Sequence, residues 1–416
     1  MRPSFLDDIS WRMAEVYAAA TDKILINLAK YFPFIKSPDQ ISGAMQFMAK
    51  KMRQIGNVVS ETISIIADTL GGADQALQNV MQETVRETLR TEEPKYRKAV
   101  EHGYLPNTGA QNIQPQQMQS YKQSYQETAQ KLNHVNTVML ESTADAYRAT
   151  VSDIAARIAR TQEILDTETT DSINGVKTWN QAMRDAVQRM VDNGLTGFVD
   201  HGGHKWSPEA YAAMVIRTET WKASREAVWE RAEQYGNDIY QVSSHNAARP
   251  LCYPWQKKLI SRNDLARDVK DLYGNTIHVY AQSETTYGQP AGLFGINCKH
   301  YPMTFIPGFS TLKGDPQEPE ENAKAYEESQ KQRALERRLR EEKRDLEVLK
   351  AQGADAKALK EQRRRIQEAS SDIAIFCEET GRTRDRSREA APVMATWPDE
   401  AGGTVQRFGG EYIQSP

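Results

Sequence analysis

Four side chains of the kind that bind transition metals lie close together in the second half of this sequence. They are two imidazoles and two thiols, His245, Cys252, Cys298 and His300. Thiolate and imidazole are ligands that zinc prefers, and four of them complete the tetrahedral coordination of a structural site. Cys298 and His300 are only two positions apart, which is closer than the ligand pairs of common zinc hairpins. The pattern leaves two interpretations open, a structural zinc site or a buried cysteine with hydrogen-bonded histidines.

A catalytic role for the same region is the alternative hypothesis. An ADP-ribosyltransferase-like enzyme would use Arg217, His245 and Glu284, whereas a nuclease would use His245 and His300. Neither activity is supported by a nucleophile signature, a phosphate-binding loop or a zincin helix in this sequence. We therefore expect no enzymatic activity and no cofactor other than a structural zinc ion.

The composition indicates a globular chain with a large wetted surface. Of its 416 residues, 39% are hydrophobic and 26% are charged, as in elongated helical proteins. The 53 basic and 56 acidic side chains give a net charge of -3, so the chain as a whole is not an electrostatic binder of nucleic acid. Three cysteines argue against a disulfide framework and fit a reducing compartment. Without a secretory leader or a run of about 18 apolar residues, we expect a soluble, cytoplasmic chain with no membrane span.

Helical periodicity dominates the first half of the sequence. Apolar residues recur every three or four positions over 6–28 and 45–66, and a further helix is expected from about Asp74 to Leu89. The pattern divides this half into an elongated N-terminal helical region (1–102), a linker rich in glutamine and asparagine (103–120) and a helical domain (121–236).

The pattern changes after Gly236. Residues 239–242 and 276–280 alternate between apolar and polar side chains, as strands do. We therefore expect a small α+β domain over 237–312, within a fold that is otherwise mainly α. This domain contains the four metal-binding types of side chain.

The C-terminal part predicts a charged antiparallel helical hairpin, residues 313–376, packed as a coiled coil. The apolar residues at heptad-type positions are Leu335, Leu339, Leu346, Leu349, Leu359, Ile366 and Ile373. The two helices are expected to turn around Gly353, over Gln352–Asp355. Residues 377–416 are expected to form a C-terminal tail.

The hairpin carries a local excess of positive charge. Residues 331–365 contain 13 basic and 7 acidic side chains. Most charge runs of this kind are the solvated flanks of a coiled coil. The alternative is contact with DNA, for which Arg363, Arg364 and Arg365 are the candidate residues.

Four short motifs occur in a recognisable order along the chain. They are Arg217-Thr218-Glu219, a block with His245, Arg249-Pro250 and Trp255-Gln256, the block Asn297-Cys298-Lys299-His300, and Phe376 followed by Glu379-Thr380-Gly381. In type and order these motifs resemble the phage minor capsid protein 2 family, relatives of the Mu F-like head morphogenesis proteins of tailed bacteriophages. The resemblance covers roughly Ala155 to Arg388. Lys257 departs from it, because the family pattern has glycine there, and this departure predicts a different local turn.

Within these motifs we expect structural roles. Arg217 and Glu219 are two positions apart, so they do not share a helix face and each should pair with another element. Arg249 is expected to bridge carbonyl or carboxylate groups, and Trp255 is expected to bury a large surface.

The resemblance implies a minor capsid protein of a tailed bacteriophage, located in the virion near the portal vertex. It implies a role in head assembly and in genome packaging or ejection. The implied partners are the portal and capsid proteins of the same virion and packaged double-stranded DNA. The protein would be present in several copies per particle and would be made in the host bacterial cytoplasm. Two alternatives remain, a virion-borne or injected enzyme and a DNA-binding coiled-coil accessory protein.

Overall fold

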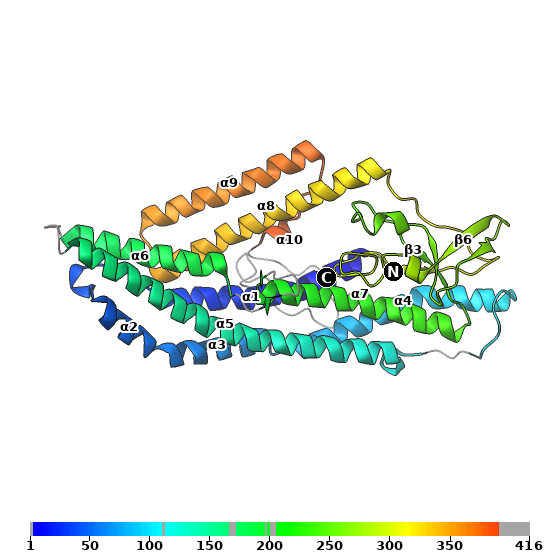
Figure 1. Ribbon diagram of the computed structural model, residues 1–416, viewed down its shortest axis with the longest axis horizontal. Coiled ribbons are helices and arrows are strands. Elements are labelled where there is room, and N and C mark those ends of the chain that lie inside the picture. Colours follow the sequence, from blue (N-terminus) through cyan, green and yellow to red (C-terminus); the bar gives the residue numbers. More distant parts are fainter. Residues whose placement is uncertain (1–2, 110–112, 166–171, 196–197, 200–204, 391–416) are drawn as a thin grey trace, which may run out of the picture.

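The computed structural model describes residues 3–109, 113–165, 172–195, 198–199 and 205–390 of the chain. Within this part, long helices form an elongated body, and a small five-stranded sheet lies at one end of the long axis (Figure 1). The predicted fold class, mainly α with a small α+β part, is confirmed. Of the helices described, none is both long enough and apolar enough to cross a lipid bilayer.

Helix α7 is the central element of the body, with α1, α4 and α5 packed along it. The Ser207 hydroxyl accepts a hydrogen bond from the Ala210 N–H, and Pro208 occupies the first helical position, so the helix begins there. Buried residues such as Ile216, Trp221 and Ala227 come from several sides of α7, which is typical of an interior helix. The helices of the body are α1 (Pro3–Lys30), α2 (Ala44–Met52), α3 (Ile55–Leu70), α4 (Ala73–Glu101), α5 (Gln119–Leu165), α6 (Ser172–Asn193) and α7 (Pro208–Gln234).

Helix α4 is longer than the sequence predicts, since it reaches Glu101 instead of ending near Leu89. Pro94 lies inside it, where the missing N–H removes one helical hydrogen bond. Tyr96, two residues later, is fully buried and stacks on Tyr235 with 4.7 Å between the ring centroids. Packing against the end of α7 therefore carries the helix past the proline.

Two other segments differ from the sequence expectation. The stripe predicted over 45–66 is divided between α2 and α3, which separate at Arg53 and Gln54. The predicted linker is partly packed, because Pro115 and Met118 are buried beside a single 3-10 turn at Pro115–Gln117. A second 3-10 turn, Pro38–Gln40, lies between α1 and α2.

A mixed sheet follows α7. Its strands, in spatial order, are β5 (Arg267–Lys270), β6 (Thr276–Ala281), β4 (Leu259–Ser261), β3 (Ile239–Val242) and β7 (Pro302–Thr304). All neighbouring strands are antiparallel except β4 and β6, which are parallel. The short strands β1 (Phe198–Val199) and β2 (Lys205–Trp206) form a separate antiparallel pair.

The sequence predicted β3 and β6 but missed the other three strands of this sheet. Each of the three has only three or four residues, too few for alternation to be recognised. β7 also begins with Pro302, which is tolerated because β7 is an edge strand. Their pairing partners, and not their own composition, make these segments strands.

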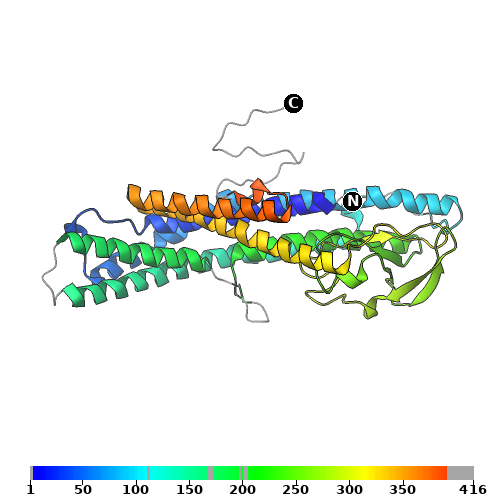
Figure 2. The same cartoon turned by 90° about the horizontal axis from the view of Figure 1, so that it is seen from above.

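Helices α8 (Pro319–Gln352) and α9 (Ala356–Thr380) form the predicted antiparallel hairpin along one side of the body (Figures 1 and 2). Gly353 ends α8 with a φ of 76°, a left-handed conformation in which a Cβ would be strained. Asp355 begins α9 by accepting a hydrogen bond from the Ala358 N–H (2.8 Å). The buried residues between the two helices are Leu339, Ala369, Ile373 and Cys377.

The hairpin is attached to the body along α1. Arg344 of α8 forms an ion pair with Asp22 of α1, and the Asp22 side chain is only 1% exposed. Gln352 at the end of α8 donates a hydrogen bond from Nε2 to the carbonyl of Phe32 (3.1 Å). Val348 of the same helix belongs to the main hydrophobic core. The hairpin is therefore part of the packed structure and not a free arm.

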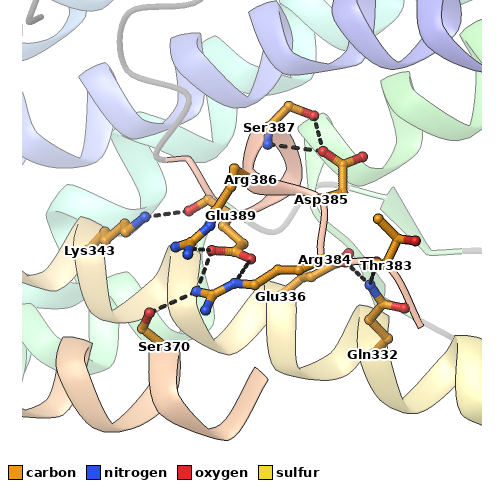
Figure 3. A network of polar contacts seen from close by, with 10 residues as sticks. All are labelled: Gln332, Glu336, Lys343, Ser370, Thr383, Arg384, Asp385, Arg386, Ser387 and Glu389. Carbon is orange, nitrogen blue, oxygen red and sulfur yellow. Dashed lines mark hydrogen bonds and ion pairs between the residues drawn. The ribbon is translucent and has the colours of Figure 1, made fainter. Parts of the chain in front are cut away.

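The residues after α9 fold back onto the hairpin (Figure 3). Arg384 forms a bidentate ion pair with Glu389 of the short helix α10 (Arg386–Glu389) and also donates to Ser370 of α9. Lys343 of α8 donates to the backbone carbonyl of Glu389 (2.7 Å). The first part of the predicted C-terminal tail is thus packed on the hairpin, and the rest of it lies outside the described residues.

Burial raises the pKa of two carboxyl groups between the hairpin and the body to about 6. One is Asp22, and the other is Asp345, whose Oδ2 accepts a hydrogen bond from Gln188 Nε2 of α6 (2.9 Å). A folded-state pKa above the unfolded-state value means that the folded state binds the proton more tightly. The stabilising contribution is therefore present at low pH and is lost as the pH rises through about 6.

Replacing Asp345 by asparagine tests this interface. We expect Asp345→Asn to raise the free energy of unfolding by about 1 kcal/mol near pH 7.5, because a neutral amide avoids the desolvation cost and still accepts the Gln188 hydrogen bond. The gain should shrink as the pH falls from about 6 to about 4. Urea denaturation at several pH values measures it, with Asp68→Asn on the exposed face of α3 as the control. A gain that is independent of pH would contradict the expectation.

Candidate functional site

The two halves of the histidine–cysteine motif meet beside the sheet. His245 and Cys252 follow β3, whereas Cys298 and His300 precede β7. Because β3 and β7 are antiparallel neighbours, the end of one strand lies beside the start of the other. The four side chains face a cavity of about 230 Å³, whose other wall is the first part of α8. The remaining lining residues are Ala247, Arg249, Asn297, Lys299, Tyr326, Ser329, Gln330 and Arg333.

Three of the four side chains form a compact buried cluster. Cys252 Sγ lies 3.8 Å from Cys298 Sγ, and Cys298 Sγ lies 3.4 Å from His300 Nδ1. All three residues are at most 3% exposed. Both cysteines are free thiols, since a disulfide would require a sulfur–sulfur distance of about 2.05 Å.

His245 lies next to this cluster, with 4.2 Å between its ring centroid and that of His300. Its Nδ1 is 2.9 Å from the carbonyl oxygen of Asn246, which can only accept, so Nδ1 carries the proton and Nε2 the lone pair. The Nε2 atoms of both histidines are buried and have no hydrogen-bond partner among the described residues. The backbone N–H of His245 donates to Gln256 Oε1 (2.7 Å), which holds the loop in place.

The environment of the cluster favours a thiolate at Cys298 and a neutral imidazole at His245. The hydrogen bond between Cys252 and Cys298 raises the pKa of Cys252 and lowers that of Cys298, so the pair shares one proton. Burial, together with the neighbouring His300, lowers the pKa of His245 to about 4. Arg249 Nη2, 3.7 Å from Cys252 Sγ, places positive charge beside the thiols.

The arginines of the motifs hold loops in place. Arg217 Nη1 donates to Asn297 Oδ1 (3.1 Å), whereas Glu219 pairs with Lys131 of α5, so the two helix residues reach different elements as their spacing predicts. Arg249 donates to the carbonyls of Ile296 (2.7 Å) and Gly292 (3.2 Å). Trp255 is half-buried against the apolar cluster beside the sheet and packs edge-on against Tyr280 (5.7 Å between centroids), so it buries part of its surface and not all of it.

The structure brings His245 and His300, the pair of the nuclease hypothesis, into one cavity, but not the three residues of the ADP-ribosyltransferase-like hypothesis. Glu284 is exposed, and its Oε2 accepts a hydrogen bond from the N–H of Ala281 in its own turn (2.6 Å). Neither Glu284 nor Arg217 lines the cavity that contains His245. The described residues therefore contain no shared site for the ADP-ribosyltransferase-like set.

The candidate DNA-binding arginines, Arg363, Arg364 and Arg365, are exposed on α9. Arg364 pairs with Glu361 (2.6 Å) and with Glu368 on the same helix. From Pro319 to Thr380 the two hairpin helices contain 14 basic and 15 acidic residues, so the local positive excess is offset within the hairpin. This balance favours a solvated coiled-coil flank over a DNA-binding surface.

Arg225 of α7, which no sequence motif indicated, lies beneath the cluster. Its guanidinium is over the ring of Phe294 (5.2 Å to the centroid), and the residue is 5% exposed. Burial lowers its pKa, an effect opposed by the negative charge of Cys298. Its position on α7, eight residues after Arg217 and therefore on the same side of the helix, is the signal that was available. No comparable sequence pattern indicated that the first part of α8 forms a wall of the cavity.

The fold and this site define an elongated helical protein in which the loops that carry the sequence motifs are tied to one central helix. The family described as "Phage minor capsid protein 2" matches residues 1–378. Because the match covers most of the chain, the protein belongs to this family, and the family resemblance seen in the sequence motifs is confirmed. It is a structural protein of a bacteriophage virion.

A curated relative supports the same assignment. It is named "Structural protein", comes from Lactococcus phage LL-H, and is 32% identical over 180 residues. These residues are 43% of this chain and 47% of the relative, so the chain spans about half of the relative's length. No solved structure is significantly similar to this chain.

Asn297 provides a test of how the site is held. Its φ is 57°, in the left-handed region, and its side chain accepts the hydrogen bond from Arg217. We expect Asn297→Ala to lower the free energy of unfolding by about 2 kcal/mol, because it loses this bond and strains the backbone. Asn297→Gly loses the bond alone and should cost about 1 kcal/mol. Equal losses in urea denaturation would contradict this explanation.

Lys257, which stands where the family pattern has glycine, has a φ of 65°. Lys257 thus adopts a left-handed backbone conformation that glycine adopts easily, so the lysine does not require a turn different from one that glycine would form. We expect Lys257→Gly to raise the free energy of unfolding by up to about 1 kcal/mol, because its ion pair with the exposed Asp315 contributes little. Lys258→Gly, the adjacent control without a positive φ, should lower it by about 0.5 kcal/mol. Thermal denaturation compares the two; a loss in both would contradict the strain argument.

Proposed function

We propose that this virion protein acts near the portal vertex during head assembly, as a bridge between portal and capsid proteins, in several copies per particle. The observation that carries the proposal is an elongated body, held together by helices packed along α7 and by the attached hairpin, with exposed apolar residues toward its two ends. A bridging protein needs stiffness between two contact surfaces, and each surface needs apolar anchors.

One group of anchors lies on α2 and α3, toward the end opposite the sheet (Figure 1). Met45 is 78% exposed, Ile63 50% and Met52 39%. Methionine side chains adapt to irregular surfaces, which suits docking on a large assembly. We assign this end to one partner.

The other group lies at the turn between β5 and β6, at the sheet end. Tyr273 is 77% exposed and Leu272 49%. Asp271 Oδ1 accepts hydrogen bonds from the backbone N–H of Tyr273 (2.9 Å) and of Asn275 (2.8 Å), so the turn is rigid. A rigid, exposed tyrosine is a typical interface anchor, because little conformational entropy is lost when it binds.

The proposal favours a structural partner over DNA. The net charge of -3 and the balanced charge of the hairpin provide little electrostatic attraction to phosphate. A role in genome packaging or ejection would then be indirect, through the position of this protein in the head.

Incorporation into particles tests the bridge. We expect Tyr273→Ala and Met45→Lys each to reduce the copies per purified head by roughly tenfold or more, because loss of a central anchor costs about 2 kcal/mol. Quantitative mass spectrometry of heads assembled with each variant measures this. Ile375→Ala, which changes an exposed isoleucine on α9, is the matched control and should incorporate normally. Normal incorporation of both end variants would contradict the proposal.

A further inference from the structure

We propose that Cys252, Cys298 and His300 bind one zinc-type metal ion, with His245 as the fourth ligand, and that this ion clamps the segment after β3 to the segment before β7. This inference does not depend on the proposed bridging function, since it concerns the chemistry of one buried site within the chain.

The spacing of the ligand atoms is the first argument. In a tetrahedral site with Zn–S of about 2.3 Å and Zn–N of about 2.0 Å, two sulfurs are about 3.8 Å apart and a sulfur and a nitrogen about 3.5 Å apart. The corresponding distances here are 3.8 Å between the sulfurs and 3.4 Å from Cys298 Sγ to His300 Nδ1. All three ligand atoms lie within 4.8 Å of one another. The cluster thus has nearly the dimensions of an occupied site.

The state of His245 is the second argument. Its Nδ1–H donates to a backbone carbonyl, which leaves the lone pair on Nε2, and metal-bound histidines are commonly oriented in this way. That Nε2 is buried without a hydrogen-bond partner among the described residues. Its ring centroid is 4.2 Å from that of His300, so rotation of the ring toward the cluster would make Nε2 a ligand and satisfy a polar atom that is otherwise costly to bury.

Charge is the third argument. Two thiolates and a divalent cation sum to zero with neutral imidazoles, so the occupied site can be buried at little cost. Arg249 Nη2, 3.7 Å from Cys252 Sγ, is placed to donate to a metal-bound thiolate. Sulfur and imidazole ligands select zinc-type ions over magnesium or calcium, which prefer oxygen.

Metal uptake by the purified full-length chain tests the site. The chain is stripped with a chelator and titrated with Co²⁺, whose tetrahedral thiolate complexes show a charge-transfer band and intense visible bands. We expect one Co²⁺ per chain and displacement of these bands by Zn²⁺. A folded wild-type chain without such bands overturns the proposal.

Variants assign the ligands. Cys298→Ser should abolish the bands, whereas Cys377→Ser, a change at the buried cysteine of the hairpin, should leave them unchanged. His245→Ala should weaken binding at least about tenfold and alter the visible bands, as loss of a ligand does. Bands that persist in Cys298→Ser, or an unchanged affinity in His245→Ala, overturn the corresponding ligand assignment.

Alkylation of the wild-type chain covers the case in which Cys298→Ser fails to fold. With Zn²⁺ bound, Cys252 and Cys298 should be modified more slowly than in the stripped chain, as measured by mass spectrometry of peptides. Cys377 provides the internal reference, and its rate should not depend on Zn²⁺. Equal rates at all three cysteines with and without Zn²⁺ overturn the proposal.

Discussion

The burial of α7 on several sides is the constraint on which the rest of the structure depends. Helices α1, α4 and α5 pack along it, and Trp229 near its C-terminal end is part of the apolar core beside the sheet. Through Arg217 and Arg225 the same helix also holds the loops beneath the histidine–cysteine cluster. The helical body and the α+β part therefore share one support and are not independent units.

Buried charges are found where this support meets other elements. Arg231 near the end of α7 pairs with Glu93 of α4 (2.7 Å), and Asp22 of α1 pairs with Arg344 of the hairpin. Pairs of this kind add little net stability, because desolvation offsets most of the attraction. Breaking one leaves an uncompensated buried charge, so they disfavour other arrangements of the helices. A single defined arrangement of the helices suits a structural protein, which must present its contact surfaces in a fixed geometry.

The histidine–cysteine region is best understood in the same terms. Its density of reactive side chains first indicates an active site, yet Arg217 and Glu284, two of the three residues of the ADP-ribosyltransferase-like hypothesis, do not line its cavity. What the region does have is a set of contacts between loops that are far apart in the sequence: Arg249 to the carbonyls of Ile296 and Gly292, and Arg217 to Asn297. The family's motifs thus maintain a local fold in a virion structural protein.

The sequence alone determined the features that depend on neighbouring residues. Helical periodicity, the turn at Gly353, two of the five strands of the sheet and the ordered motifs of the family could all be predicted, because each is encoded within a short window. The tertiary structure decided the rest. Packing against α7 extends α4 past Pro94, pairing makes strands of β4, β5 and β7, and the first part of α8 completes the pocket. These features depend on contacts between residues far apart in the chain, which no local pattern records.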